Sequence, residues 1–333
     1  MKRRLLTLAA FLLVILLAAC GNNDSNAESA DGGNDNNNEV ITVGYQKGNT
    51  INILKERGNL DEALEEAGYS IDWREFPTGS VLLEALNTNN IDFGHASDGN
   101  GVFMQSGGHD INYVASEAPY PEGVALVAKA ESDIESVEDL EGKTIGVTKG
   151  GNQHYLLLEA LEEAGVSLDD VEIRYYKDAS EGLIAFTQDE FDVYGSWDPY
   201  LAIVESQIDT RTIVNGTDFS ENRTFYFATD ELVNDNPEVV SIILEELQNV
   251  DQWSNENKEE VAEILAEQLG LDGEPLELAN NRRTFGVESM KEEIIDSQQR
   301  LADVFYESGL LENDIQVEDA VNVEDIDLPE NVD

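Results

Sequence analysis

Short apolar stretches recur along the chain, and patterns typical of helices lie between many of them. The strand-like stretches are 41–45, 71–73, 91–94, 111–115, 123–128, 144–148, 171–176, 191–196, 212–214 and 224–228. Between two of them, segment 153–164 repeats leucine at helical spacing, and Gly165 follows as a helix stop. Strands that alternate with helices are typical of parallel or mixed sheets covered by helices. The pattern therefore predicts an α/β protein.

The C-terminal part of the chain is predicted to be helical. Asn236 is placed to cap a helix that has Pro237 at its first position. The buried stripe expected for this helix is Val240, Ile243, Leu244 and Leu247. Segments 258–269 and 289–308 have the same character, and the acidic tail after Glu312 is expected to pack loosely.

One unit occurs twice, at 43–94 and at 145–195. Each copy has a strand, a Lys-Gly turn (Lys47-Gly48 and Lys149-Gly150), a helix that ends in Glu-Glu-Ala-Gly, a second strand and a short helix. The copies close with the similar sequences Ile-Asp-Phe-Gly and Phe-Asp-Val-Tyr-Gly. Two similar units predict two lobes that face each other, with a small ligand held where they meet.

Changes in composition indicate where the chain passes between the lobes. Segment 128–139 is acidic with little apolar periodicity, and segment 215–221 is polar. We therefore assign 40–128 together with 222–333, which includes the C-terminal helices, to lobe I and 129–221 to lobe II. Two crossings make a hinge, so the halves are expected to close on a ligand.

The N-terminus has the pattern of an export signal. In segment 1–19, three basic residues precede an apolar run from Leu5 to Leu17 that is too short for a confident membrane span. Leu-Ala-Ala-Cys, ending at Cys20, resembles a bacterial lipobox, which implies a lipid on the sulfur of the chain's only cysteine. The alternative is a plain secretory signal with an incidental cysteine. The polar segment 20–39 is predicted to be a disordered tether. We expect a protein anchored by lipid to the extracellular face of the membrane.

The chain is strongly acidic. It has 70 Asp and Glu but 19 Lys and Arg, a net charge of −51. This balance argues against nucleic acid and anionic membrane surfaces as partners. The acids do not form a calcium loop, and their dispersal predicts a solvated surface suited to a salty medium, because the Debye length falls to roughly 3 Å at 1 M salt. We expect stability to fall when salt is removed.

Four turns that follow predicted strands are the candidate binding loops. Ligands of open α/β sheets bind beyond the carboxyl ends of the strands, where glycines and helix N-termini present N–H groups to an anion. Trp197 is expected either to wall the organic part of a ligand or to be a buried aromatic. The candidate ligand-binding residues are Gln46, Lys47, Gly48, Asn49, Thr50, Ser97, Asp98, Gly99, Gly150, Gly151, Asn152, Gln153, His154, Trp197 and Asp198.

Other chemistries are less favoured. No P-loop or dinucleotide fingerprint is present, and His95, His109 and His154 are too isolated for a metal site, so neither cofactor nor metal is expected. A surface hydrolase with Ser97 or Ser196 as nucleophile and His154 as base is the alternative, but Gly-x-Ser-x-Gly is absent. Arg282 and Arg283 either reach the cleft or pair with surface acids, and we favour the second.

Several sequence blocks together resemble the aliphatic sulfonate-binding proteins of ABC importers, within the wider nitrate/sulfonate/taurine family. The blocks are Gly44–Gly48, Trp73–Gly79, Leu83–Leu86, Ile91–Gly94, Lys149-Gly150 with His154, Trp197–Tyr200, Gly216–Asp218 and Phe225-Tyr226. The resemblance implies a two-lobed type II periplasmic-binding-protein fold. It also implies a monomer that captures an anionic solute and delivers it to a membrane permease.

The chain departs from that family in two candidate ligand loops, at 96–101 and at 151–153. An aliphatic sulfonate is the expected solute. Because of these departures, taurine, nitrate and a pyrimidine precursor stay open as alternatives.

Overall fold

The structure is a computed structural model that describes residues 38–323, 326 and 328. The predicted signal peptide, Cys20 and nearly all of the tether lie outside the described residues. The first strand begins at Glu39, the last residue of the predicted tether. Within the part of the chain that is described, no helix combines the length and the apolar character needed to cross a membrane.

The first sheet has six strands in the order β11-β4-β10-β3-β1-β2. Strand β1 runs parallel to β2 and β3, whereas β10 is antiparallel to β3 and β4. The strands are β1 (Glu39–Tyr45), β2 (Tyr69–Glu75), β3 (Phe93–Ser97), β4 (Asn112–Glu117), β10 (Thr224–Ala228) and β11 (Val287–Glu288). Their helices are α1 (Thr50–Arg57), α2 (Asn59–Ala67), α3 (Gly79–Asn87), α4 (Asp98–Ser106), α8 (Asp230–Asp235), α9 (Pro237–Glu256), α10 (Lys258–Leu269), α11 (Gly273–Asn281) and α12 (Glu292–Glu307).

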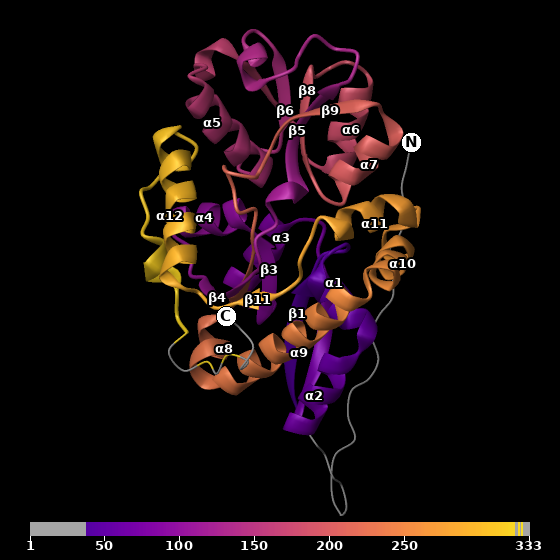
Figure 1. Cartoon of the computed structure of the whole chain (residues 1–333). Coiled ribbons are helices and arrows are strands. Elements are labelled where there is room, and N and C mark those ends of the chain that lie inside the picture. Colours follow the sequence, from indigo (N-terminus) through magenta and orange to yellow (C-terminus); the bar gives the residue numbers. More distant parts are fainter. Residues whose placement is uncertain (1–37, 324–325, 327, 329–333) are drawn as a thin grey trace, which may run out of the picture. The chain divides into compact units, whose positions relative to one another are not determined.

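The second sheet has five strands in the order β7-β6-β8-β5-β9. Strand β6 is parallel to β7 and β8, and β5 is antiparallel to β8 and β9. The strands are β5 (Val124–Lys129), β6 (Thr144–Val147), β7 (Glu172–Tyr175), β8 (Val193–Trp197) and β9 (Thr210–Asn215), with helices α5 (Asn152–Ala164), α6 (Ala179–Thr187) and α7 (Tyr200–Gln207). Figure 1 shows the two sheets as separate groups of strands, with α12 beside α4 and α5 and with α11 beside α7.

Each of the ten predicted strands overlaps an observed strand, and helix α10 has the predicted bounds. The predicted apolar stripe of α9 is buried against the first sheet. The sequence did not predict β11 or α11. The expectation of a loose tail after Glu312 was wrong for Val317, which is completely buried in the cluster that also holds Phe305.

Strand β5 pairs with the second sheet, although the predicted boundary placed 124–128 in lobe I. The chain therefore crosses between the sheets before Val124 rather than after Ala128. The apolar content of a fully buried strand does not reveal which sheet it joins, since that depends on long-range pairing with β8 and β9. The second change of sheet lies between β9 and β10.

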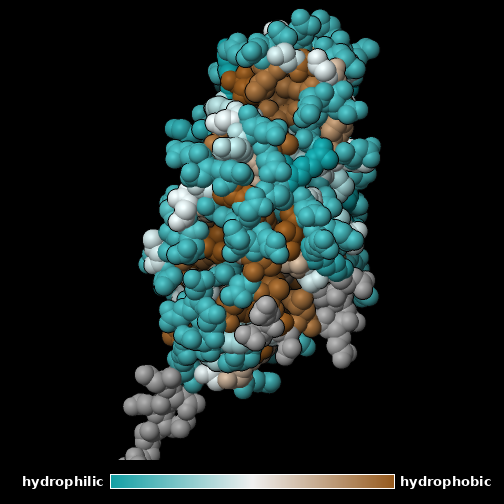
Figure 2. Space-filling model, turned by 90° about the vertical axis from the view of Figure 1, so that its left-hand side faces the viewer, coloured by the Kyte–Doolittle hydropathy of each residue, from teal (hydrophilic) through white to brown (hydrophobic). Residues whose placement is uncertain are grey.

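The hydrophobic clusters do not respect the division into sheets. Tyr155 and Leu158 of α5, a helix of the second sheet, belong to a cluster formed mainly by α3, α4 and α12 beside the first sheet. Tyr155 meets Phe305 of α12 edge-on, with ring centroids 6.0 Å apart. Figure 2 shows the face near α12, where hydrophilic residues surround smaller hydrophobic areas.

Candidate functional site

The first predicted loop follows β1 and leads into α1. Gly48 has φ 92°, a value that favours glycine, and its N–H donates to Asn52 Oδ1 over 3.2 Å. Asn49 caps α1 by accepting a hydrogen bond from Asn52 N at 3.3 Å. Lys47 forms a half-exposed ion pair with Glu75, with Nζ 3.6 Å from Oε1. The loop is thus held by its own polar groups.

The loop between β6 and α5 repeats this arrangement in the second sheet. Gly150 has φ 72°, and its N–H donates to His154 Nδ1 over 3.1 Å. Gly151 is the N-cap of α5 and has no side chain to satisfy the helix N–H groups. Asn152 Nδ2 donates to Asn222 Oδ1, which joins α5 to the second crossing segment.

Two buried histidines accept hydrogen bonds from these loops. His95 Nε2 lies 3.3 Å from Gln46 N and 2.8 Å from Asn49 Nδ2. Burial lowers the pKa of His95 to about 4. Burial, helped by the charge of Lys149, also lowers the pKa of His154 to about 4. Both rings are therefore neutral near pH 7 and can accept from an N–H group.

The third loop, between β3 and α4, contains a buried carboxyl group. Asp98 is 4% exposed, and its Oδ1 accepts from Gly99 N at 2.7 Å. Burial raises the pKa of Asp98 to about 7, although the Gly99 hydrogen bond opposes this. Among the described residues, no cationic side chain pairs with it. Ser97 Oγ accepts from Asn100 Nδ2 at 2.9 Å.

The fourth loop follows β8. Asp198 accepts hydrogen bonds from Ala202 N at 3.0 Å, from Tyr120 and from Arg282. Burial raises its pKa, and the bonds from Tyr120 and Arg282 oppose this. Trp197 meets Tyr200 edge-on, with centroids 5.5 Å apart. Asp198 is thus engaged by protein groups, although the sequence analysis assigned it to a ligand.

The four loops meet in pairs across the two sheets. A Cβ added to Gly99 would overlap the carbonyl oxygen of Gly150, and one added to Gly48 would lie 3.9 Å from Pro199 Cγ. The third loop therefore touches the second, and the first lies beside the fourth. Gln153 is not at this meeting point, because its side chain turns inward to Thr148 and Tyr176.

Both arginines make contacts with weakly exposed side chains that the sequence did not predict. Arg283 donates to Thr50 Oγ1 over 3.0 Å and pairs with Glu117, which also accepts from Tyr226 at 2.9 Å. Arg282 pairs with Asp198 and Glu205. The prediction that they pair with surface acids was wrong for Glu117, which is buried, and for Asp198, whose side chain is 2% exposed. Their only sequence signal was adjacency in a chain with few basic residues.

The carboxyl oxygens of Asp251 are buried without a hydrogen-bond partner among the described residues. The same holds for Ser254 Oγ and Asn52 Nδ2. Burial, reinforced by the charge of Glu117, raises the pKa of Asp251 well above its usual range. A neutral Asp251 removes the cost of burying a second carboxylate beside Glu117.

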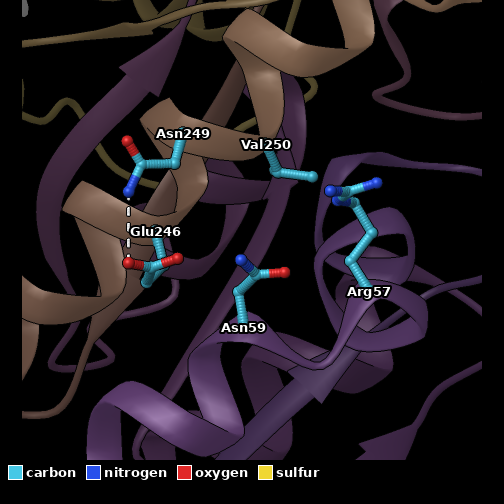
Figure 3. Close-up of a pocket in the computed structure, with 5 residues that line it drawn as sticks. All are labelled: Arg57, Asn59, Glu246, Asn249 and Val250. Carbon is cyan, nitrogen blue, oxygen red and sulfur yellow. Dashed lines mark hydrogen bonds between the residues drawn. The ribbon is translucent and has the colours of Figure 1, made fainter.

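Two small pockets lie in the described part of the chain, and one of them borders the third loop at Asp98. One has an empty volume of about 230 Å³ and includes Asp98, Tyr155, Asn222 and Gln298. The other, of about 210 Å³, is lined by Arg57, Asn59, Glu246, Asn249 and Val250, where Figure 3 shows Asn249 bonded to Glu246. Among the described residues, no group of His, Cys, Asp and Glu is arranged to hold a metal ion.

The family model described as NMT1/THI5 like matches residues 64–261, more than half of the chain. The chain belongs to the NMT1/THI5-like family. A putative aliphatic sulfonates-binding protein of Escherichia coli is 31% identical over 84% of this chain and 87% of its own length. The resemblance seen in the sequence is therefore confirmed.

Solved structures of two binding proteins share the fold. The periplasmic aliphatic sulphonate binding protein of Escherichia coli has a TM-score of 0.80 at 29% identity, over 85% of this chain and 97% of its own. The alkanesulfonate-binding protein of Xanthomonas axonopodis pv. citri, bound to MOPS, has a TM-score of 0.77 at 29% identity, over 85% and 98%. The predicted two-sheet periplasmic-binding-protein fold is confirmed.

Proposed function

We propose that this chain is the solute-binding component of an ABC importer and captures a small anionic organic solute, in the first place an aliphatic sulfonate. The observation that carries the proposal is the meeting of the four loops, in which loops from both sheets lie against each other at Gly99–Gly150 and Gly48–Pro199. Full-length similarity to sulfonate-binding proteins supports the same solute class.

The binding mechanism we propose is closure of two lobes about the crossing segments. A solute that contacts both lobes binds the closed form more tightly and so shifts the population toward it. The donors we propose belong to loop residues 46–50, 97–99, 150–152 and 154 at the N-termini of α1, α4 and α5, where the helix dipole favours an anion. Trp197 forms the apolar wall.

Calorimetry at molar salt with ethanesulfonate, taurine, nitrate and sulfate tests the solute class. We expect ethanesulfonate to bind and to be recovered unchanged by mass spectrometry, because the protein carries solute without a chemical step. Absence of binding by all four anions would overturn the proposal, and binding of nitrate or taurine alone would move it to the corresponding alternative. The hydrolase alternative has no support in the contacts, since His154 Nδ1 and Ser97 Oγ bond to Gly150 and Asn100.

We also propose that the mature protein is a monomer attached through lipid on Cys20 to the extracellular face of the membrane, next to the permease. The position of Cys20 at the end of a lipobox-like sequence supports the anchor. Metabolic labelling with palmitate is expected to mark the wild type but not Cys20→Ser, which is released from membranes. Equal labelling of the two proteins contradicts the anchor.

The net charge of −51 supports a protein adapted to high salt. Self-repulsion of the acids is screened at about 1 M salt and is strong in dilute buffer. We expect the melting temperature to rise between dilute buffer and molar NaCl. A melting temperature that does not change rejects this part of the proposal.

A further inference from the structure

Arg282 joins elements of the two sheets. It lies at the C-terminus of α11, a helix whose Leu276 packs in the core of the first sheet. Its Nη1 lies 3.3 Å from both carboxylate oxygens of Asp198, and its Nη2 bonds to Glu205. Asp198 and Glu205 belong to the end of β8 and to α7, which are parts of the second sheet. Figure 1 shows α11 beside α7.

Tyr120 holds the same carboxylate from the first crossing segment. Its hydroxyl contacts Asp198 Oδ2 and lies 2.7 Å from the carbonyl oxygen of Ala279 in α11. Its N–H donates to Glu221 O of the second crossing segment over 2.8 Å. We give the name clasp to the group formed by Arg282, Asp198, Glu205 and Tyr120. It connects both crossing segments with α11 and α7.

The clasp is shielded from solvent. The side chain of Asp198 is 2% exposed and that of Arg282 is 19% exposed. Another ion pair between the two parts of the molecule, Arg300 of α12 with Glu159 of α5, has an arginine that is 70% exposed. Salt screens exposed pairs much more than buried ones, and hydrogen bonds between charged groups are stronger where water is excluded. In molar salt, the clasp is therefore stronger than the ion pair between Arg300 and Glu159.

We propose that Arg282 is a positioning residue for solute retention. Its bonds form only when α11 and α7 lie together, so they stabilise the closed form and slow the release of solute. This inference rests on the proposed function. Because a solute enters the open form, in which the clasp is broken, loss of the clasp enlarges the open population and does not slow association, whereas it speeds dissociation because the closed complex opens more often.

Stopped-flow measurements with ethanesulfonate in molar NaCl test this role. We expect Arg282→Ala to raise the dissociation rate by about 10- to 100-fold, within the usual range of conformational coupling, and not to lower the association rate. Arg282→Lys should raise the dissociation rate less than Arg282→Ala does, because it keeps the positive charge. It should not restore the wild-type rate, because an ammonium group cannot bond both acids in the same fork geometry. Arg300→Ala changes the rate by less than about threefold, as expected for an exposed pair.

Arg174→Ala is the matched control, since the bonds of Arg174 among the described residues stay within the part of the chain that forms the second sheet, to Glu172 and to Glu190 O. It is expected to leave both rates unchanged. X-ray scattering without solute gives a second readout, in which Arg282→Ala has a larger radius of gyration than wild type and Arg174→Ala does not.

An unchanged dissociation rate in Arg282→Ala overturns the inference while leaving the proposed function intact. Equal loss in Arg174→Ala shows a general effect of removing an arginine and also overturns it. If wild type binds no anion, the proposed function fails, and the scattering comparison alone then decides whether Arg282 holds the closed form.

Discussion

In the repeated units 43–94 and 145–195, the turn after the first strand is built in the same way. Gly48 and Gly150 both have positive φ, and the N–H of each donates to a side chain four residues later. The acceptor is Asn52 Oδ1 in the first unit and His154 Nδ1 in the second. Two different side chains therefore solve the same local problem of holding a glycine turn at a helix start.

The ends of the two units also match at the level of side chains. Asp92 and Asp192 accept from Thr42 N and Thr144 N, at 2.7 and 2.8 Å. Arg74 and Arg174 donate to the backbone oxygens of Asn90 and Glu190, at 2.5 and 3.1 Å. These bonds are distant in sequence, but each lies within its unit or starts one residue before it, so they repeat with the unit.

The units differ where they face each other. Asp98 and Asp198 each follow the last strand of a unit, and both are buried with a raised pKa. Among the described residues, the side chain of Asp98 accepts only from its neighbour Gly99, whereas that of Asp198 is held by Tyr120 and Arg282. The repeat therefore places an aspartate at the same position in both units, whereas contacts with the rest of the chain determine its charge and its role.

The largest expected effect separates the two glycine turns. Gly150→Ala combines a positive φ with overlap of the new Cβ and the Phe103 ring, so we expect a loss of about 4 kcal/mol of unfolding free energy. Gly48→Ala meets nothing closer than 3.4 Å, and backbone strain alone costs about 1.5 kcal/mol. Urea denaturation measures both, and equal losses would contradict the asymmetry. Gly273→Ala, with nothing within 4 Å, is the control.

The next effect separates the two aspartates. The unfolded pKa of Asp98 is 3.8 and burial raises the folded value to about 7, so its contribution to stability is present below pH 3.8 and is lost as pH rises through 7. Asp98→Asn removes this loss. As pH rises from 5 to 8, the unfolding free energy of Asp98→Asn should therefore increase by about 3 kcal/mol relative to that of wild type, as measured by urea denaturation. Asp198→Asn gains less, because Arg282 stabilises the charge it removes. A pH-independent difference for Asp98→Asn rejects the prediction.

A third change transfers the first turn into the second. His154→Asn places at position 154 the residue type that holds Gly48, so we expect the Gly150 bond to survive. His154 has an unfolded pKa of 6.5 and a folded pKa of about 4, so its contribution is present above 6.5 and is lost as pH falls toward 4. Wild type should lose about 2 kcal/mol more unfolding free energy than His154→Asn when the pH is lowered from 8 to 5, as measured by urea denaturation. An unchanged pH profile shows that His154 is not the group that titrates.

The smallest effect concerns the matched arginines. Arg74 and Arg174 pair with Asp72 and Glu172, and all four side chains are about half exposed. Exposed pairs contribute at most about 1 kcal/mol, so Arg74→Ala and Arg174→Ala should each lower the unfolding free energy by less than that. The two losses are expected to agree within error in urea denaturation. A large difference between them breaks the equivalence of the units.

The sequence by itself determined the fold class, the ten strands and the four loops, because hydrophobic period, glycine turns and helix caps act over a few residues. It also determined the repeat, because the bonds of Asp92 and Asp192 are copied with it. Three features depend on tertiary packing: the pairing of β5 with the second sheet, the contact of Gly99 with Gly150 and the hydrogen bond from Arg283 to Thr50. These contacts join parts of the chain that are distant in sequence, 233 residues apart for Arg283 and Thr50. No local preference encodes such a contact, since its partner is fixed only when both sheets have formed and packed.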